Sequence, residues 1–157
     1  MQLQRRSHQH GFSLIELIVV IAIIFVLLAI AIPNAMNVRR NTLEAIVMRE
    51  IQTIHQAQVQ YMSQFGKYAG GLEELGPPKS GSEGPRAANL IPASLASGEK
   101  DGYLFTLKET PEGYVINANP KVFGSTGRRT FYLDQNGVIH HNWGPEPATT
   151  NSPEIGK

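Results

Sequence analysis

Residues 12–32 read FSLIELIVVIAIIFVLLAIAI, an apolar run that is interrupted by a single acid, Glu16. At about 1.5 Å of rise per helical residue the run covers roughly 30 Å, the thickness of the hydrocarbon core of a bilayer. A carboxylate in that environment costs at least ~2.5 kcal/mol, so it marks a functional position and needs a partner. The run therefore predicts a transmembrane helix in which Glu16 has a task other than anchoring.

Two ordinary interpretations of this N-terminal segment fit poorly. A secretory signal peptide has an apolar region of about 7–15 residues and a small-residue cleavage site, whereas this run is longer and ends at Ile32-Pro33-Asn34. A plain signal anchor, with Arg5 and Arg6 holding the N-terminus in the cytoplasm, explains the orientation and the span. It leaves Glu16 without a purpose.

A third interpretation uses every feature of the segment. Gly11-Phe12-Ser13-Leu14-Ile15-Glu16, with the aliphatic run and Pro33 after it, resembles the N-terminus of type IV pilin-like proteins. This family comprises type IV pilins and the pseudopilins of type II secretion, which share a class III prepilin signal. The resemblance implies that a prepilin peptidase removes residues 1–11 by cutting after Gly11 and that Phe12 is then N-methylated. It also implies an assembly role for Glu16 and a helix kink at Pro33.

The chemistry of this arrangement can be argued from the residues. A cut after Gly11 frees an α-amine at Phe12, four residues before Glu16. A pair formed within one chain does nothing to join subunits. A pair between neighbouring subunits turns two charges that are costly in lipid into a hydrogen-bonded contact, and it fixes their axial register. Recognition of Glu16 by the assembly platform is the alternative that the sequence leaves open.

The helical pattern continues beyond Pro33. Apolar residues recur at steps of three and four as far as Phe65, Gln58 fills one position of this stripe, and Gly66 is the expected stop. Charged residues, Glu44 among them, fall mostly on the other faces. The pattern predicts one helix over residues 12–65, transmembrane over 12–32, kinked near Pro33 and amphipathic beyond it, where it packs on the chain's own sheet.

The rest of the chain divides by composition. Residues 66–100 are rich in Gly, Pro and Ser and predict a loop-rich connector with short helices at 72–75 and 93–96. Residues 101–143 predict antiparallel strands at 103–108, 114–118, 129–133 and 138–141, with a turn at Asn136-Gly137. Residues 144–157 predict a flexible tail. The fold class is α+β: a long N-terminal helix packed against a small four-stranded antiparallel sheet.

Other candidate sites have simpler explanations. His140 and His141 are adjacent on a predicted strand and point to opposite faces, so they do not share a metal ion. Asp134–Gly137 resembles the opening of a calcium loop, but a hairpin turn explains it and the later ligands of such a loop are missing. Residues 121–129 lack the order of a phosphate-binding loop and predict a flexible loop with two solvated arginines.

Bulk properties narrow the function classes. The chain has no cysteine and a net charge of +1, so it offers no disulfide framework, no thiolate site and no basic nucleic-acid footprint. We predict no enzyme, no metal and no cofactor. We expect a filament subunit that is held in the bacterial inner membrane with its C-terminal part in the periplasm. Its partners, as the resemblance implies, are further copies of itself, the prepilin peptidase, a platform protein and an assembly ATPase.

The destination of the filament stays open. The cysteine-free C-terminal half and its compact ending favour a type II secretion pseudopilin. An extracellular type IV pilus subunit, serving adhesion, motility or DNA uptake, is the first alternative. A monomeric membrane-anchored periplasmic binding domain is the second.

Overall fold

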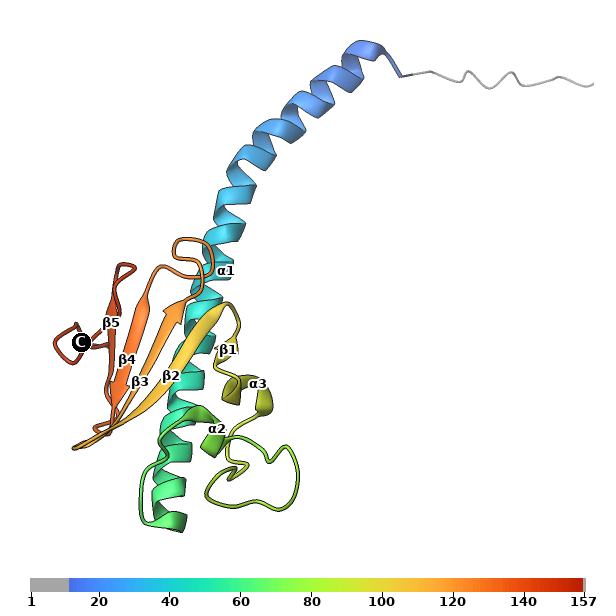
Figure 1. Ribbon diagram of the computed structural model, residues 1–157. Helices are drawn as coiled ribbons and strands as arrows, with labels where there is room; N and C mark the ends of the chain where they lie inside the picture. The colour runs from blue at the N-terminus through green and yellow to red at the C-terminus, as the bar shows by residue number, and fades with distance from the viewer. Residues whose placement is uncertain (1–11, 157) are drawn as a thin grey trace, which may run out of the picture. The chain divides into compact units, whose positions relative to one another are not determined.

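A computed structural model describes residues 12–156 and contains two compact units, one that ends at Val38 and one that begins at Arg39. Helix α1 (Leu14–Phe65) contributes to both units. The second unit also holds the short helices α2 (Leu72–Leu75) and α3 (Ala93–Ala96) and a five-stranded sheet (Figure 1). The predicted α+β class, with a long N-terminal helix and an antiparallel sheet, is confirmed.

In the first unit, α1 presents an apolar surface that no other part of this unit covers. Its large apolar side chains in this unit range from 42% exposed at Ile21 to 76% at Leu14. The helix continues through Pro33, and the kink predicted there stays a prediction. Gly11 and the rest of the predicted leader lie outside the described residues.

The sheet of the second unit has strand order β1-β2-β3-β4-β5, with every neighbouring pair antiparallel. Its strands are β1 (Glu99–Lys100), β2 (Tyr103–Thr110), β3 (Gly113–Pro120), β4 (Thr130–Asp134) and β5 (Ile139–Asn142). The prediction of four strands was therefore one short. The strand it lacked, β1, has only two residues, which is too few to show the alternation that identifies a strand.

The core lies between one face of the sheet and the part of α1 beyond Arg39 (Figure 1). Tyr103, Phe105 and Leu107 of β2 are buried and alternate with exposed neighbours, as a half-buried strand requires. They share one apolar cluster with Ile51 and Ile54 of α1. The predicted stripe of the helix therefore packs on the chain's own sheet.

Two polar side chains of α1 bind the connector to the helix. Gln58, the polar member of the apolar stripe, is fully buried, and its side-chain amide makes two hydrogen bonds to the backbone of Ala69, of 2.8 and 2.9 Å. The hydroxyl of Tyr61 donates to the Pro85 carbonyl at 2.5 Å. A buried amide with both groups paired costs little and fixes where the chain returns after α1. Both short helices lie where they were predicted.

The predicted turns are found. Gly66, with φ +71°, follows the last residue of α1 and ends the helix in the left-handed conformation. In the β4–β5 hairpin, the Asn136 N–H donates to Asp134 Oδ1 at 2.9 Å, and Gly137 takes the positive φ of +77°. Asn136 itself is not left-handed, so the turn relies on Gly137 alone.

The structure differs from the prediction of a flexible tail. Residues 144–156 follow the sheet: the Glu146 and Ala148 carbonyls accept hydrogen bonds from Thr130 and Asn117. Further along, the His141 N–H donates to the Pro153 carbonyl at 2.9 Å, and the segment forms an isolated bridge to β5. Composition suggested mobility, but an edge strand leaves backbone groups unpaired, and this segment pairs some of those of β5.

Candidate functional site

Glu16 lies in the first turn of α1, where it caps the helix. The Ser13 N–H donates to Glu16 Oε2 at 2.9 Å, while the Ser13 carbonyl accepts the first helical bond, from Leu17. This is half of the reciprocal capping arrangement that the sequence pattern Ser-x-x-Glu favours. The capping role of Glu16 was not predicted, although Ser13-Leu14-Ile15-Glu16 carries the capping signal in the sequence.

The capping bond leaves most of the hydrogen-bond acceptor positions of the Glu16 carboxylate unused. An ionised carboxyl group has two oxygens and about four acceptor positions, and the bond from Ser13 uses one of them on Oε2. The remaining capacity suits a cationic donor such as an ammonium group. Capping within the chain and ion pairing with another group are therefore compatible at Glu16.

The apolar surface around this acid needs a covering. Among the described residues, α1 is the helix long and apolar enough to cross a membrane, and the span in question is its N-terminal part. Soluble monomers rarely expose contiguous apolar patches above a few hundred Å². The apolar surface of the segment 14–32 therefore needs to be covered by lipid, by other apolar helices, or by first one and then the other.

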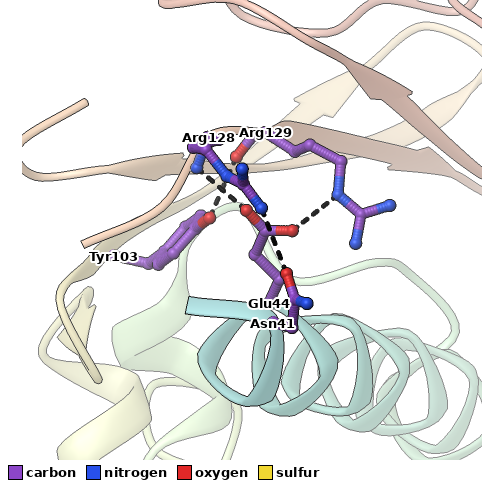
Figure 2. Close-up of polar contacts among 5 residues, drawn as sticks. All are labelled: Asn41, Glu44, Tyr103, Arg128 and Arg129. Carbon is purple, nitrogen blue, oxygen red and sulfur yellow. Dashed lines mark hydrogen bonds and ion pairs between the residues drawn. The ribbon is translucent and has the colours of Figure 1, made fainter. Parts of the chain in front are cut away.

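A second acid on α1, Glu44, is buried at the centre of a polar cluster (Figure 2). Its Oε2 lies 2.7 Å from Arg129 Nε, and its Oε1 accepts the backbone N–H of Arg128 at 2.9 Å. Arg128 Nη2 donates to Asn41 Oδ1 at 3.2 Å, one turn earlier on the helix. The cluster fastens the β3–β4 connection, residues 121–129, to the first turns of α1 in the second unit.

This cluster corrects two expectations. Glu44 was expected on a solvent-facing side of α1 and the two arginines in a flexible loop, but Glu44 is 0% exposed and Arg129 is its ion-pair partner. The guanidinium of Arg129 also lies 4.9 Å from the ring centroid of Trp143. A signal was present: Glu44 precedes the buried Val47 and Ile51 by three and seven residues, which places it on the core face.

We expect Glu44→Ala to destabilise the second unit strongly. The substitution leaves the Arg129 guanidinium and the Arg128 N–H without their acceptor, and breaking a buried pair from one side costs about 3–5 kcal/mol. Thermal unfolding of the full chain in detergent measures the loss. The matched control is Glu99→Gln, which breaks the Glu99–Lys121 pair, where both side chains are 52% exposed. Such an exposed pair contributes less than about 1 kcal/mol. Equal losses in the two variants would contradict the prediction.

A partly buried histidine on the same helix, His55, pairs with a tyrosine of the sheet. The Tyr114 hydroxyl lies 2.6 Å from His55 Nδ1. Burial raises the pKa of Tyr114, so the phenol keeps its proton and donates it. Burial also lowers the pKa of His55 from its ordinary value of 6.5, against an opposing effect of Asp134. The neutral imidazole is therefore the form that the fold holds.

These shifts predict that stability falls with acidification. Because the folded-state pKa of His55 is depressed, the unfolded chain binds more protons as the pH drops through 6.5 and below. The contribution of His55 to the free energy of unfolding is then constant above this range and decreases below it. Unfolding midpoints measured between about pH 7.5 and about pH 5.5 test this. In the control His55→Asn, an amide oxygen can accept from Tyr114 without titrating, so the slope should flatten; an unchanged slope would contradict the assignment.

The residues weighed above as candidate metal or calcium ligands make ordinary structural contacts. His140 Nδ1 lies 2.7 Å from the Ser152 carbonyl, whereas His141 contacts the Trp143 ring. Asp134 caps its own turn. Within residues 12–156 no group of three potential metal ligands comes together.

Comparisons with known proteins agree with the N-terminal motif. The family described as "Prokaryotic N-terminal methylation motif" matches residues 6–32. The "Type IV major pilin protein PilA" of Myxococcus xanthus (strain DK1622) is 35% identical over 66 residues. That alignment covers 42% of this chain and 30% of the relative, so the chain spans under a third of the relative's length. No solved structure matches the chain significantly.

The fold and the N-terminal segment define an α+β protein with a long apolar N-terminal helix and a methylation motif. Together with the matched relative, they make the chain similar to type IV pilin-like proteins that carry a class III prepilin signal.

Proposed function

We propose that this chain is a structural subunit of a filament, made as a prepilin, cleaved after Gly11, N-methylated at Phe12 and polymerised through its apolar helix. The observation that carries the proposal is the first unit: an apolar helix with every large side chain exposed, and one carboxylate in its first turn. A membrane covers this surface before assembly. A bundle of the same helices from other copies covers it afterwards.

Glu16 and the Phe12 amine form the contact that sets the register between subunits. Glu16 Oε2 is engaged by Ser13 of its own chain, and the carboxylate has acceptor capacity left for the ammonium of a neighbour. Because both charges are costly in lipid, pairing favours the assembled state over the separated one.

The experiment that tests the pathway is mass spectrometry of the mature N-terminus, after expression in cells that contain a prepilin peptidase. The proposal predicts a first residue Phe12 that carries a methyl group. A mature chain that begins beyond residue 30, or that retains residues 1–11, contradicts it.

We propose two alternative filaments for this subunit, and the one we favour comes first. The first is a pseudopilus of type II secretion, supported by the absence of cysteine from the whole sequence. The second is an extracellular pilus, favoured by the relative, whose printed name is that of a major pilin. Fibres that are released by shear and contain this chain would support the pilus. A periplasmic assembly that is required for enzyme export would support the pseudopilus.

The proposed partners follow from the pathway. They are the prepilin peptidase, a platform protein and an assembly ATPase, acting on a chain held in the inner membrane. The role is structural rather than catalytic. A third possibility, a monomeric anchored binding domain, predicts that neither fibres nor cross-linked oligomers form.

A further inference from the structure

The end of the second unit where α1 enters it carries a surface that the filament contact at Glu16 does not use. We define the basal patch as Arg39, Arg40, Val122 and Phe123. Arg39 is exposed and Arg40 partly exposed. Val122 and Phe123, which are adjacent in the β3–β4 connection, are 55% and 45% exposed.

The two halves of the basal patch are held at the same end of the unit. The hydrogen bonds from Arg128 to Asn41 and Glu44 place the β3–β4 connection beside the first turns of α1 after Arg40 (Figure 2). Within that connection, Ser125 and Thr126 N–H groups donate to the Val122 carbonyl, at 3.1 and 3.0 Å. The loop is therefore preorganised, and its two apolar side chains are presented rather than buried.

We propose that the basal patch docks on the headgroup layer of anionic phospholipids. This docking proposal rests on the proposed function, because it requires the apolar helix to span a membrane. Arg39 follows Ile32 by seven residues, about 10 Å of helix, and the headgroup layer extends roughly 5–8 Å beyond the hydrocarbon. The flexible arginine side chains bridge the difference by snorkelling.

The chemistry of the basal patch favours lipid over a second copy of the chain. Two arginines match the negative charge of phosphate groups, while Val122 and Phe123 suit the boundary between headgroups and acyl chains. Two copies that met through this patch would bring like charges together, which is costly. The nearby Lys121 is paired with Glu99 at 2.5 Å and adds little charge to the surface. Docking would hold the sheet-bearing unit against the membrane until the subunit is extracted.

The test uses the full chain, one copy per nanodisc, with a fluorophore on a single introduced cysteine, since the chain has none. The label is placed by Ser125→Cys in the β3–β4 connection or, as the distant reference, by Ser82→Cys in the connector. Both positions are exposed. Discs contain phosphatidylcholine with or without phosphatidylglycerol, plus a lipid that carries a quenching spin label on its headgroup. Insertion into the disc is scored separately.

The proposal predicts strong quenching at residue 125 in anionic discs and weak quenching at residue 82. Arg39→Gln with Arg40→Gln should reduce the docked population by about fivefold per arginine, and added salt should act in the same direction. The matched control Arg49→Gln, an exposed arginine further along α1, should change nothing.

Equal quenching at the two positions, or quenching at residue 125 that ignores the arginine substitutions, would overturn the proposal. So would a signal that requires two copies per disc. These results would leave the filament proposal standing, because the assay involves neither cleavage nor polymerisation. A chain that fails to insert into the disc at all would overturn both.

Discussion

Glu16→Val abolishes incorporation into filaments while leaving the chain processed and inserted in the membrane. The substitution removes the only acid of the segment 12–32, and with it the partner that we propose for the methylated Phe12 amine of a neighbouring subunit. Breaking a buried pair from one side costs about 3–5 kcal/mol, so incorporation should fall by more than about a hundredfold. Sedimentation of sheared or cross-linked filaments, with an antibody against this chain, measures it.

The control must separate two roles of the same carboxylate. Glu16 also caps α1 through the Ser13 N–H, and a lost cap weakens a helix by about 0.5–2 kcal/mol. Glu16→Gln retains an oxygen that can accept from Ser13 and removes the charge. If charge pairing drives assembly, Glu16→Gln fails nearly as badly as Glu16→Val. If Glu16→Gln assembles normally, capping is the role that matters and the pairing model is wrong.

The fold was predictable where the signal lies in local sequence. The apolar run, the stripe that ends at Phe65 and the stop at Gly66 set the bounds of α1 to within two residues. Alternation located four of the five strands, because each is long enough to repeat. The period of side chains along a helix or a strand is a local property, and sequence reveals it.

Contacts between distant segments were not predictable in the same way. Glu44 and Arg129 are 85 positions apart in the sequence. The residues that flank each of them do not indicate that the two side chains form an ion pair. The docking of residues 144–156 depends on backbone groups that β5 leaves unpaired, which exist only once the sheet has formed. At Glu16 the sequence carried both the charge and the capping pattern Ser-x-x-Glu, and the bond from the Ser13 N–H agrees with that pattern.

Gly11→Val leaves the precursor uncut, heavier than the mature chain by the mass of residues 1–11. A peptidase must bring its catalytic acids against the backbone at the scissile bond, and glycine, which has no Cβ, permits this close approach. Valine places a branched, rotationally restricted side chain there. Gel mobility and intact mass, after expression with a prepilin peptidase, separate the two species. Because the Phe12 amine is never freed, this variant should also carry no methyl group and should not assemble.

The rate of cleavage should decrease as the side chain at residue 11 becomes larger. Gly11→Ala adds one methyl group and should be cut more slowly than the native chain but faster than Gly11→Val. The matched control is Gly84→Val: a Cβ at Gly84 meets nothing within 4 Å, so the fold accommodates it, and cleavage should be unchanged. Normal processing of Gly11→Val would place the cut elsewhere. Glu16 would then lose its amine partner at Phe12, and the register contact proposed between subunits would fall with it.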